Sequence, residues 1–291
     1  MAPPKKVLML CGDYMEDYEA AVPFYALAGL GVAVHCAAPG KAPGDPCLTA
    51  LAGGTWVEPD PFSLCVADGH VLTAIGWPAH GEIIGQLLRA LGGRVLGGRG
   101  QGVLFLCADY VDDYEANVPF RALAGVGCRV EAACPTKRKG EPCVTAIYDD
   151  VAVAPGAVSD EKRGHNFVMT VDWADINVDD YECVVVPGGR SPELLVTNEK
   201  AVALVGQFAA KGKVVASIDQ GHLVLAAAGL LKGKRCASGV PMRVVSNLAG
   251  AAAVEPQGAV ADGKLVTAAS WPDLAEFIAR LVDLLGITVS F

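Results

Sequence analysis

The stretch VVASIDQGHLVLAAAG, residues 214–229, predicts a buried strand, a tight polar turn and a helix in immediate succession. Its first five residues have no polar face, which is typical of a strand covered on both sides of a parallel sheet. Several α/β enzymes present a nucleophile on such a strand–turn–helix elbow. The residue at the tip here is Asp219, which is neither Ser nor Cys. The elbow therefore has either unusual chemistry or no nucleophile.

The surrounding sequence alternates strand-like and helix-like segments. Short apolar runs that predict strands occupy residues 102–107, 128–134 and 182–189. Apolar residues at helical spacing predict helices over residues 108–127, 198–212, 220–233 and 271–286. This alternation predicts a doubly wound α/β domain with a parallel sheet. In such sheets, sites form beyond the carboxyl ends of the strands.

Composition and charge narrow the classes of function. The chain has 291 residues, of which 52% are hydrophobic, and a net charge of −9. We expect no nucleic-acid partner, because Lys and Arg form no cluster beyond residues 137–139. We expect no membrane partner, because no apolar run reaches the roughly 18 residues of a span. The first residues show no signal or transit peptide, so we expect a cytoplasmic protein.

Ten cysteines are present, without CxxC or Cys/His zinc spacing. Cys11, Cys107 and Cys183 lie in or beside strand-like runs, which predicts reduced, buried thiols. We therefore expect no metal site and no cofactor.

The chain contains an internal repeat. Residues 7–50 align without gaps to residues 103–146, with 27 identities in 44 positions. A second match joins residues 51–61 to residues 248–258 and residues 66–84 to residues 260–278. The two matches are adjacent in the first copy but about 100 residues apart in the second, so the first copy lacks its middle. Either the remnant over residues 1–98 docks on the second copy, or it reflects exon loss or a faulty gene model. We expect a poorly packed, incomplete copy there and a complete domain over residues 102–291.

Three polar turns follow predicted strands of the complete copy. Gly188 and Gly189 let backbone N–H groups approach a ligand, and Arg190 adds a cation suited to an anion. A tight turn with a solvated Arg190 is the alternative. His165 follows a charged stretch and is either a loop residue or a ligand contact above the cleft.

Two carboxylates are candidates for chemistry. Glu115 lies early in a predicted helix, and its repeat partner is Glu19. Asp219 at the elbow either caps the next helix or projects into the cleft. If Glu115 approaches Asp219, like charges would share one site and favour a bound proton. We expect His222, three positions after the elbow tip, to pack inside.

Together these motifs resemble the DJ-1/PfpI family, in particular its tandem-domain plant members. The matching stretches are LCGDYMEDYE, LCADYVDDYE, RGHNF, VVPGGRSPE, VASIDQGHLVLAAAG and LLGITVSF. The resemblance implies a flavodoxin-like sandwich, glyoxalase-type activity on methylglyoxal with or without glutathione as co-substrate, and a role in oxidative or carbonyl stress. It also implies a catalytic Cys on the elbow, hydrogen-bonded to a helix Glu that matches Glu115.

The elbow departs from the family pattern. Where the family has Ile-Cys-His-Gly, this chain has Ile-Asp-Gln-Gly, so Asp219 and Gln220 replace the Cys and the His. Leu274 stands where the family has a His, although the first copy keeps His80. Glyoxalase chemistry in this family needs a thiolate. We therefore expect a catalytically degenerate homologue that binds a small carbonyl or anionic ligand.

Three alternatives remain at this stage. The chain is a residual glyoxalase, a lyase that uses Glu115 and Asp219 as an acid–base pair, or an interaction module that forms homo-oligomers. A further hypothesis is that Asp219 mimics the sulfinate of an oxidised family Cys and accepts a hydrogen bond from Glu115.

Overall fold

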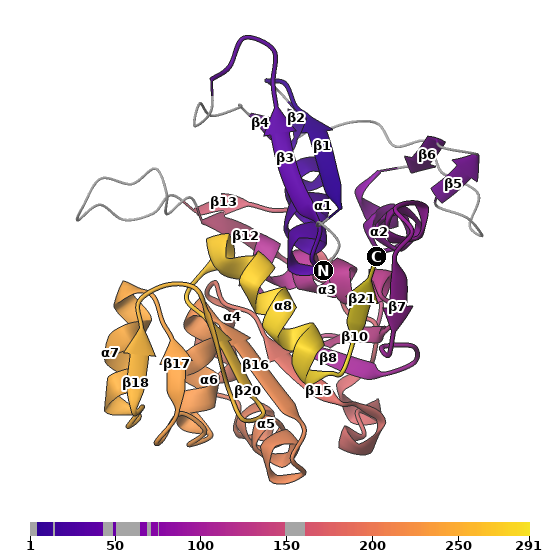
Figure 1. Ribbon diagram of the computed structural model, residues 1–291. Helices are drawn as coiled ribbons and strands as arrows, with labels where there is room; N and C mark the ends of the chain where they lie inside the picture. The colour runs from indigo at the N-terminus through magenta and orange to yellow at the C-terminus, as the bar shows by residue number, and fades with distance from the viewer. Residues whose placement is uncertain are drawn as a thin grey trace.

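The computed structural model describes residues 5–13, 15–42, 49–50, 65–68, 71–74, 76–148 and 161–291. A six-stranded sheet forms its centre (Figure 1). In spatial order its strands are β10 (Arg129–Ala133), β8 (Gly102–Leu106), β15 (Cys183–Val186), β16 (Val214–Ile218), β20 (Leu265–Ala268) and β19 (Ala259–Asp262). The first five strands are parallel, and β19 pairs antiparallel to β20.

Helices connect and cover these strands. They are α3 (Asp113–Gly125), α4 (Ser191–Leu195), α5 (Glu199–Ala210), α6 (His222–Ala227), α7 (Val240–Leu248) and α8 (Leu274–Leu284). The doubly wound fold predicted from the sequence is confirmed. The predicted helix over 220–233 is shorter, because its first residues form a 3-10 turn over Asp219–Gly221.

Short strands complete the second copy. They are β9 (Val111–Asp112), β11 (Pro142–Cys143), β12 (Thr145–Tyr148), β13 (Glu161–Arg163), β14 (Phe167–Val168), β17 (Arg235–Ala237), β18 (Ala253–Glu255) and β21 (Thr288–Ser290). All residues of β8, β15 and β16 are buried, as their apolar sequences require. The sheet core therefore belongs to the second copy.

The first copy contributes two helices and several short strands. They are β1 (Lys6–Leu10), β2 (Met15–Glu16), α1 (Asp17–Gly29), β3 (Ala33–Ala37), β4 (Thr49–Ala50), β5 (Cys65–Asp68), β6 (Val71–Ala74), α2 (His80–Ala90) and β7 (Arg94–Leu96). The parallel β1–β3 pair stands apart from the six-stranded sheet (Figure 1). The segments predicted to match at residues 51–61 lie outside the described residues.

The helices of the first copy dock on those of the second. Helix α1 packs against α3 and α8, and α2 packs against α3. Their inward side chains are buried: Tyr18, Val22, Leu27, Ile84 and Leu88. The expectation of a poorly packed remnant is therefore wrong for α1 and α2, because the second copy supplies the apolar surface that they need. It holds for β1, where Leu8 and Leu10 are exposed.

Equivalent contacts occur twice between the copies, which defines a pseudo-two-fold axis. Strand β21 pairs antiparallel with β7, and Val289 faces Val95, its own repeat partner. The rings of the repeat partners Tyr18 and Tyr114 have centroids 5.9 Å apart, and α1 contacts α8 as α3 contacts α2. Such self-complementary contacts are the mark of an isologous interface. The described helices of the first copy therefore pack on the second copy as one half of such an interface.

Seven of the nine cysteines among the described residues are buried. Cys107 and Cys183 are fully buried, as predicted, and Cys11 is half-buried. Among the described residues, no helix is long and apolar enough to cross a membrane.

Candidate functional site

The strand order fixes where a site can form. From β8 the chain passes first to β10 on one side and then to β15 on the other. The carboxyl ends of β8 and β15 therefore flank a topological switch point, where open α/β sheets bind ligands. The helix that starts after β8 carries Glu115, the turn after β15 carries Gly188, and the turn after β16 carries Asp219. All three predicted positions meet at this edge of the sheet.

Glu115 is held in place from two sides. It lies in the first turn of α3, is 2% exposed, and its backbone N–H donates to the Asp112 carboxylate at 2.9 Å. Its own Oε2 accepts the backbone N–H of Gly188 at 2.7 Å. The side chain therefore reaches from α3 across to the turn after β15.

Positions 188 and 189 require glycine, because neighbouring groups lie too close to leave room for a side chain. A Cβ at Gly188 would lie 2.6 Å from Glu115 Oε2 and 3.0 Å from Asp219 Cβ. At Gly189 the backbone has φ +69°, and a Cβ would lie 2.4 Å from the backbone nitrogen of Asp112. Only glycine fits both positions. Glu115 and Asp219 therefore flank the same spot, the bare backbone of Gly188.

Asp219 occupies a strained elbow. Its φ is +45°, a left-handed conformation that residues other than glycine adopt rarely and mostly at functional sites. The N-cap of α6 is Gly221, and neither helical segment after β16 has a side-chain cap hydrogen bond. Asp219 is thus not the N-cap residue of either helical segment, and its half-buried side chain stands at the elbow tip. A Cβ at Gly221 would lie 2.2 Å from the Val186 carbonyl oxygen, so the tight turn needs that glycine.

Two further predicted site residues are Gln220 and Arg190. Gln220 is half-buried beside Asp219. The Arg190 side chain is exposed, and its Nη2 lies 3.3 Å from Glu193 Oε2. Its backbone N–H donates to the carbonyl of Tyr110 at 2.8 Å, and Tyr110 has φ +63°. A ligand contact by Arg190 remains a prediction, and Tyr110 is a strained neighbour that the sequence did not single out.

Asp112 is a further residue that sequence reasoning missed. Its carboxylate caps α3 through the N–H of Glu115, and its own N–H donates to the Gly188 carbonyl at 3.2 Å. Burial, followed by the nearby charges of Asp113 and Asp219, raises the pKa of Asp112 well above its usual range. The spacing of Asp112 and Glu115 is that of a capping box, a signal readable from sequence.

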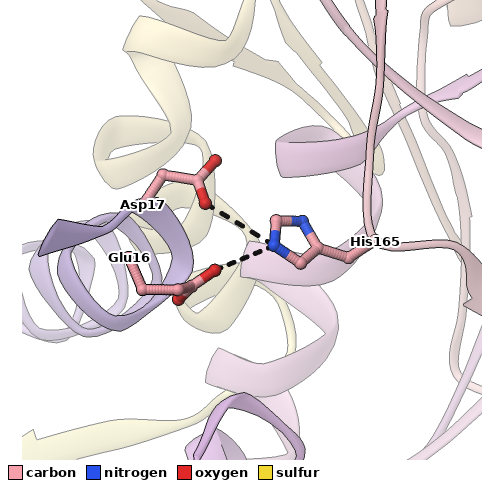
Figure 2. A group of neighbouring side chains, drawn as sticks. All are labelled: Glu16, Asp17 and His165. Atoms are coloured by element: carbon pink, nitrogen blue, oxygen red, sulfur yellow. Dashed lines mark hydrogen bonds and ion pairs between the residues drawn. The ribbon is translucent and has the colours of Figure 1, made fainter. Parts of the chain in front are cut away.

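His165 lies at the junction of the two copies. Its Nδ1 is 2.8 Å from Asp113 Oδ2, and its Nε2 is 2.8 Å from Glu16 Oε1 (Figure 2). The ring stacks on Tyr18 with centroids 3.7 Å apart. Burial lowers the pKa of His165, but the hydrogen bonds to Asp113 and Glu16 outweigh it and raise the pKa to about 10. These contacts engage both ring nitrogens, and a role in ligand binding at the elbow remains a prediction.

His222 is a packed core residue, as predicted. It is fully buried, its Nε2 lies 2.7 Å from the Ala237 carbonyl oxygen, and its Nδ1 lies 3.3 Å from Ser217 Oγ. Burial lowers its pKa to about 4. The ring is therefore neutral near pH 7 and supports the turn behind the elbow.

A flavodoxin-like sheet, a strained elbow and a buried helix glutamate define an α/β protein with a nucleophile-elbow architecture. The model of the DJ-1/PfpI family matches residues 101–284. The chain belongs to the DJ-1/PfpI family.

Three relatives show the extent of the similarity. The chain is 41% identical to DJ-1 protein homolog E of Arabidopsis thaliana, covering 99% of this chain and 98% of that one. It is 29% identical to the deglycase PfpI of Pyrococcus furiosus, covering 63% of this chain and 98% of that one. A ThiJ/PfpI domain protein from Brachyspira murdochii matches with a TM-score of 0.53 and 15% identity, over 65% of this chain and 98% of that one, which shows the fold.

Proposed function

We propose that this chain is a ligand-binding member of the DJ-1/PfpI family, associated with carbonyl or oxidative stress, that does not turn over its ligand. The observation that carries this proposal is Asp219 at φ +45° on the elbow, beside the buried Glu115. The elbow presents its tip as a nucleophile elbow does, but the tip is a carboxylate.

The side chain at the elbow tip decides whether a bound carbonyl compound can react, and here that side chain is the carboxylate of Asp219. A thiolate adds readily to an aldehyde carbon, whereas a carboxylate is a poor nucleophile whose adduct collapses back. The relative in Pyrococcus furiosus is named a deglycase. A carbonyl compound is accordingly the class of ligand that we assign to this elbow, without the covalent step that a cysteine would supply.

The groups around Gly188 limit the ligand further. Glu115 Oε2 and Asp219 Cβ both lie close to this position, so two carboxylate side chains border it. Carboxylates accept hydrogen bonds, so a small carbonyl compound with a hydroxyl donor is matched better than an anion. An anion would bind only with a proton taken up between these groups.

Methylglyoxal consumption, with and without glutathione, tests the proposal. We expect no consumption by the wild-type protein and measurable consumption by Asp219→Cys combined with Gln220→His. The gain should disappear when Glu115→Ala is added, because the buried glutamate contacts the same spot as the new thiol. Consumption by the wild-type protein that is lost in Glu115→Ala would show an active enzyme and contradict the proposal.

The charge of Asp219 is the second point to test. As a permanent mimic of a sulfinate, Asp219 would stabilise the elbow through its anion. Asp219→Asn keeps the shape and removes the charge, so we expect weaker ligand binding and a lower free energy of unfolding. If calorimetry and urea denaturation find both unchanged, the mimicry idea fails.

A further inference from the structure

We propose that Glu16, Asp17 and His165 hold a divalent transition-metal ion between the two copies. Figure 2 shows the two carboxylates from the start of α1 pointing at the ring nitrogen of His165. One ligand atom from each residue can be chosen so that all three atoms lie within 4.8 Å of one another. The site is separate from the elbow, so this proposal does not rest on the proposed function.

Each of the two carboxylates has one oxygen fixed from outside and one oxygen turned to the ring. Glu16 Oε2 accepts the backbone N–H of Glu19 at 2.8 Å, and Glu16 Oε1 lies 2.8 Å from His165 Nε2. Asp17 Oδ2 accepts the Tyr114 hydroxyl at 2.5 Å, and Asp17 Oδ1 lies 3.5 Å from the same Nε2. The outer hydrogen bonds thus orient both carboxylates toward one point.

His165 is arranged in the same way. Its Nδ1 is hydrogen-bonded to Asp113, whose other oxygen accepts the backbone N–H of His165 at 3.0 Å. Metal-bound histidines usually have a carboxylate on the other ring nitrogen, which fixes the ring and makes it a better ligand. Asp113 therefore acts as a positioning residue, and an ion would replace the proton between Nε2 and Glu16.

A buried oxygen without a hydrogen bond also points to the ion, because its ion-pair contact with His165 Nε2 is as long as 3.5 Å. Asp17 is 4% exposed, and its Oδ1 is buried without a hydrogen-bond partner. A buried carboxylate oxygen without a partner is unfavourable, and native proteins seldom leave one. A cation 2 Å away, roughly the usual metal–oxygen distance, would satisfy it.

The ligand set indicates the class of metal. A tetrahedral ion with ligand distances of about 2.1 Å keeps its ligand atoms roughly 3.4 Å apart, close to the present spacing. One imidazole with two carboxylates suits zinc, iron(II) or manganese(II) better than calcium or copper(I). Three protein ligands leave a fourth position for water. The metal site was not expected from the sequence, because the ligands are 149 residues apart.

An ion here would join the two copies. Glu16 and Asp17 belong to the first copy, and His165 belongs to the second. A metal that binds the folded protein and not the unfolded chain stabilises the folded state. We expect zinc to raise the melting temperature and to slow proteolysis near residue 16.

Cobalt(II) and zinc(II) titrations of the metal-free full chain test the site. We expect one cobalt ion per chain, with visible d–d bands and without the sulfur-to-cobalt charge transfer that cysteine ligands would give. Calorimetry should show that Asp17→Asn and His165→Gln weaken zinc binding by more than about 10-fold. The matched control is Glu19→Gln, which removes the same charge from an exposed position of the same turn and should bind zinc as the wild type does.

The Glu16→Gln variant removes one metal ligand and should still fold, so it separates loss of binding from loss of structure. Its amide oxygen can still accept the N–H of Glu19, so the start of α1 is preserved while one ligand is lost. The proposal is overturned if the wild type binds no cobalt or zinc, if binding shows the thiolate band, or if the folded Glu16→Gln variant binds zinc as tightly as the wild type.

Discussion

The first strands of the two copies, β1 and β8, have similar sequences but differ in how deeply they are buried. Leu104 in β8 is 0% exposed, whereas its repeat partner Leu8 in β1 is 63% exposed. Strand β8 has neighbours on both sides, β10 and β15, whereas β1 pairs with β3 alone among the strands that the structure describes. The apolar run is the same kind of strand in both copies. Its burial is decided by the strands and helices that follow it in the chain.

The first helices show the opposite outcome. Helices α1 and α3 also arise from the repeat, and both are packed, because each contacts the other and a second helix. Each helix contributes a tyrosine to the pseudo-two-fold axis, and the ring centroids of Tyr18 and Tyr114 are 5.9 Å apart. The described parts of the two copies thus share an interface between helices, whereas β1 and β3 do not join the six-stranded sheet.

The strand comparison gives the largest expected effect. Leu104→Ala removes a buried side chain and should lower the free energy of unfolding by about 2–5 kcal/mol. Leu8→Ala, at the equivalent position, should change it by less than about 0.5 kcal/mol. Urea denaturation of both variants measures the difference. Equal losses would mean that β1 is as well covered in solution as β8.

The pseudo-two-fold axis predicts that alanine at either of two equivalent glycines, Gly29 or Gly125, lowers the free energy of unfolding by a similar amount. A Cβ at Gly29 would lie 2.8 Å from the Ala275 carbonyl oxygen, and a Cβ at Gly125 would lie 2.8 Å from Ile84 Cγ2. Gly29→Ala and Gly125→Ala should each cost about 1–3 kcal/mol by overpacking the same kind of helix contact. Thermal unfolding of the two variants measures this.

Gly206 in α5 provides the control for these glycines. A Cβ there would meet nothing within 4 Å, so Gly206→Ala should stabilise the helix by about 0.5–1 kcal/mol. If Gly29→Ala behaved like Gly206→Ala, α1 would not dock on α8 in solution.

Among the described residues, the elbow occurs in the second copy alone. The buried His222 behind it should make the stability of that copy depend on pH. Burial lowers the folded-state pKa to about 4, below the usual value of 6.5. The neutral ring therefore contributes its full stability above pH 6.5, and that contribution is lost as the pH falls toward 4. Relative to His222→Asn, the wild type should lose about 2 kcal/mol between pH 7.5 and pH 5. A constant difference in urea denaturation would mean that the ring titrates normally.

The sequence predicted the sheet and most of the elbow correctly for a physical reason. Strands buried on both faces have no polar positions, and the strand–turn–helix at 214–229 carries its own signals of periodicity and glycine. Glu115, Gly188 and Asp219 were singled out because each follows such a strand, and their role in a functional site stays a prediction. Their meeting point depends on the strand order, which periodicity does not reveal.

The inter-copy cluster could not be predicted from the sequence. His165 contacts Glu16 and Tyr18, which are far away in the chain and belong to the other copy. Local patterns indicate that α1 is a largely apolar helix, but not which surface covers it. The repeat could have predicted this contact, because two copies of one interface helix are suited to pair with each other.

The smallest expected effect compares two equivalent ion pairs. Lys41 Nζ lies 3.0 Å from Asp13, and Lys137 Nζ lies 2.7 Å from Asp109, and the side chains of both pairs are partly exposed. Partly exposed pairs contribute little, so Lys41→Met should cost less than about 1 kcal/mol. Lys137→Met should also cost less than about 1 kcal/mol, and its hydrogen bond to the Pro142 carbonyl at 2.7 Å should still count at high salt. Urea denaturation at low and high salt would test this, since screening should reduce the ionic part of both losses.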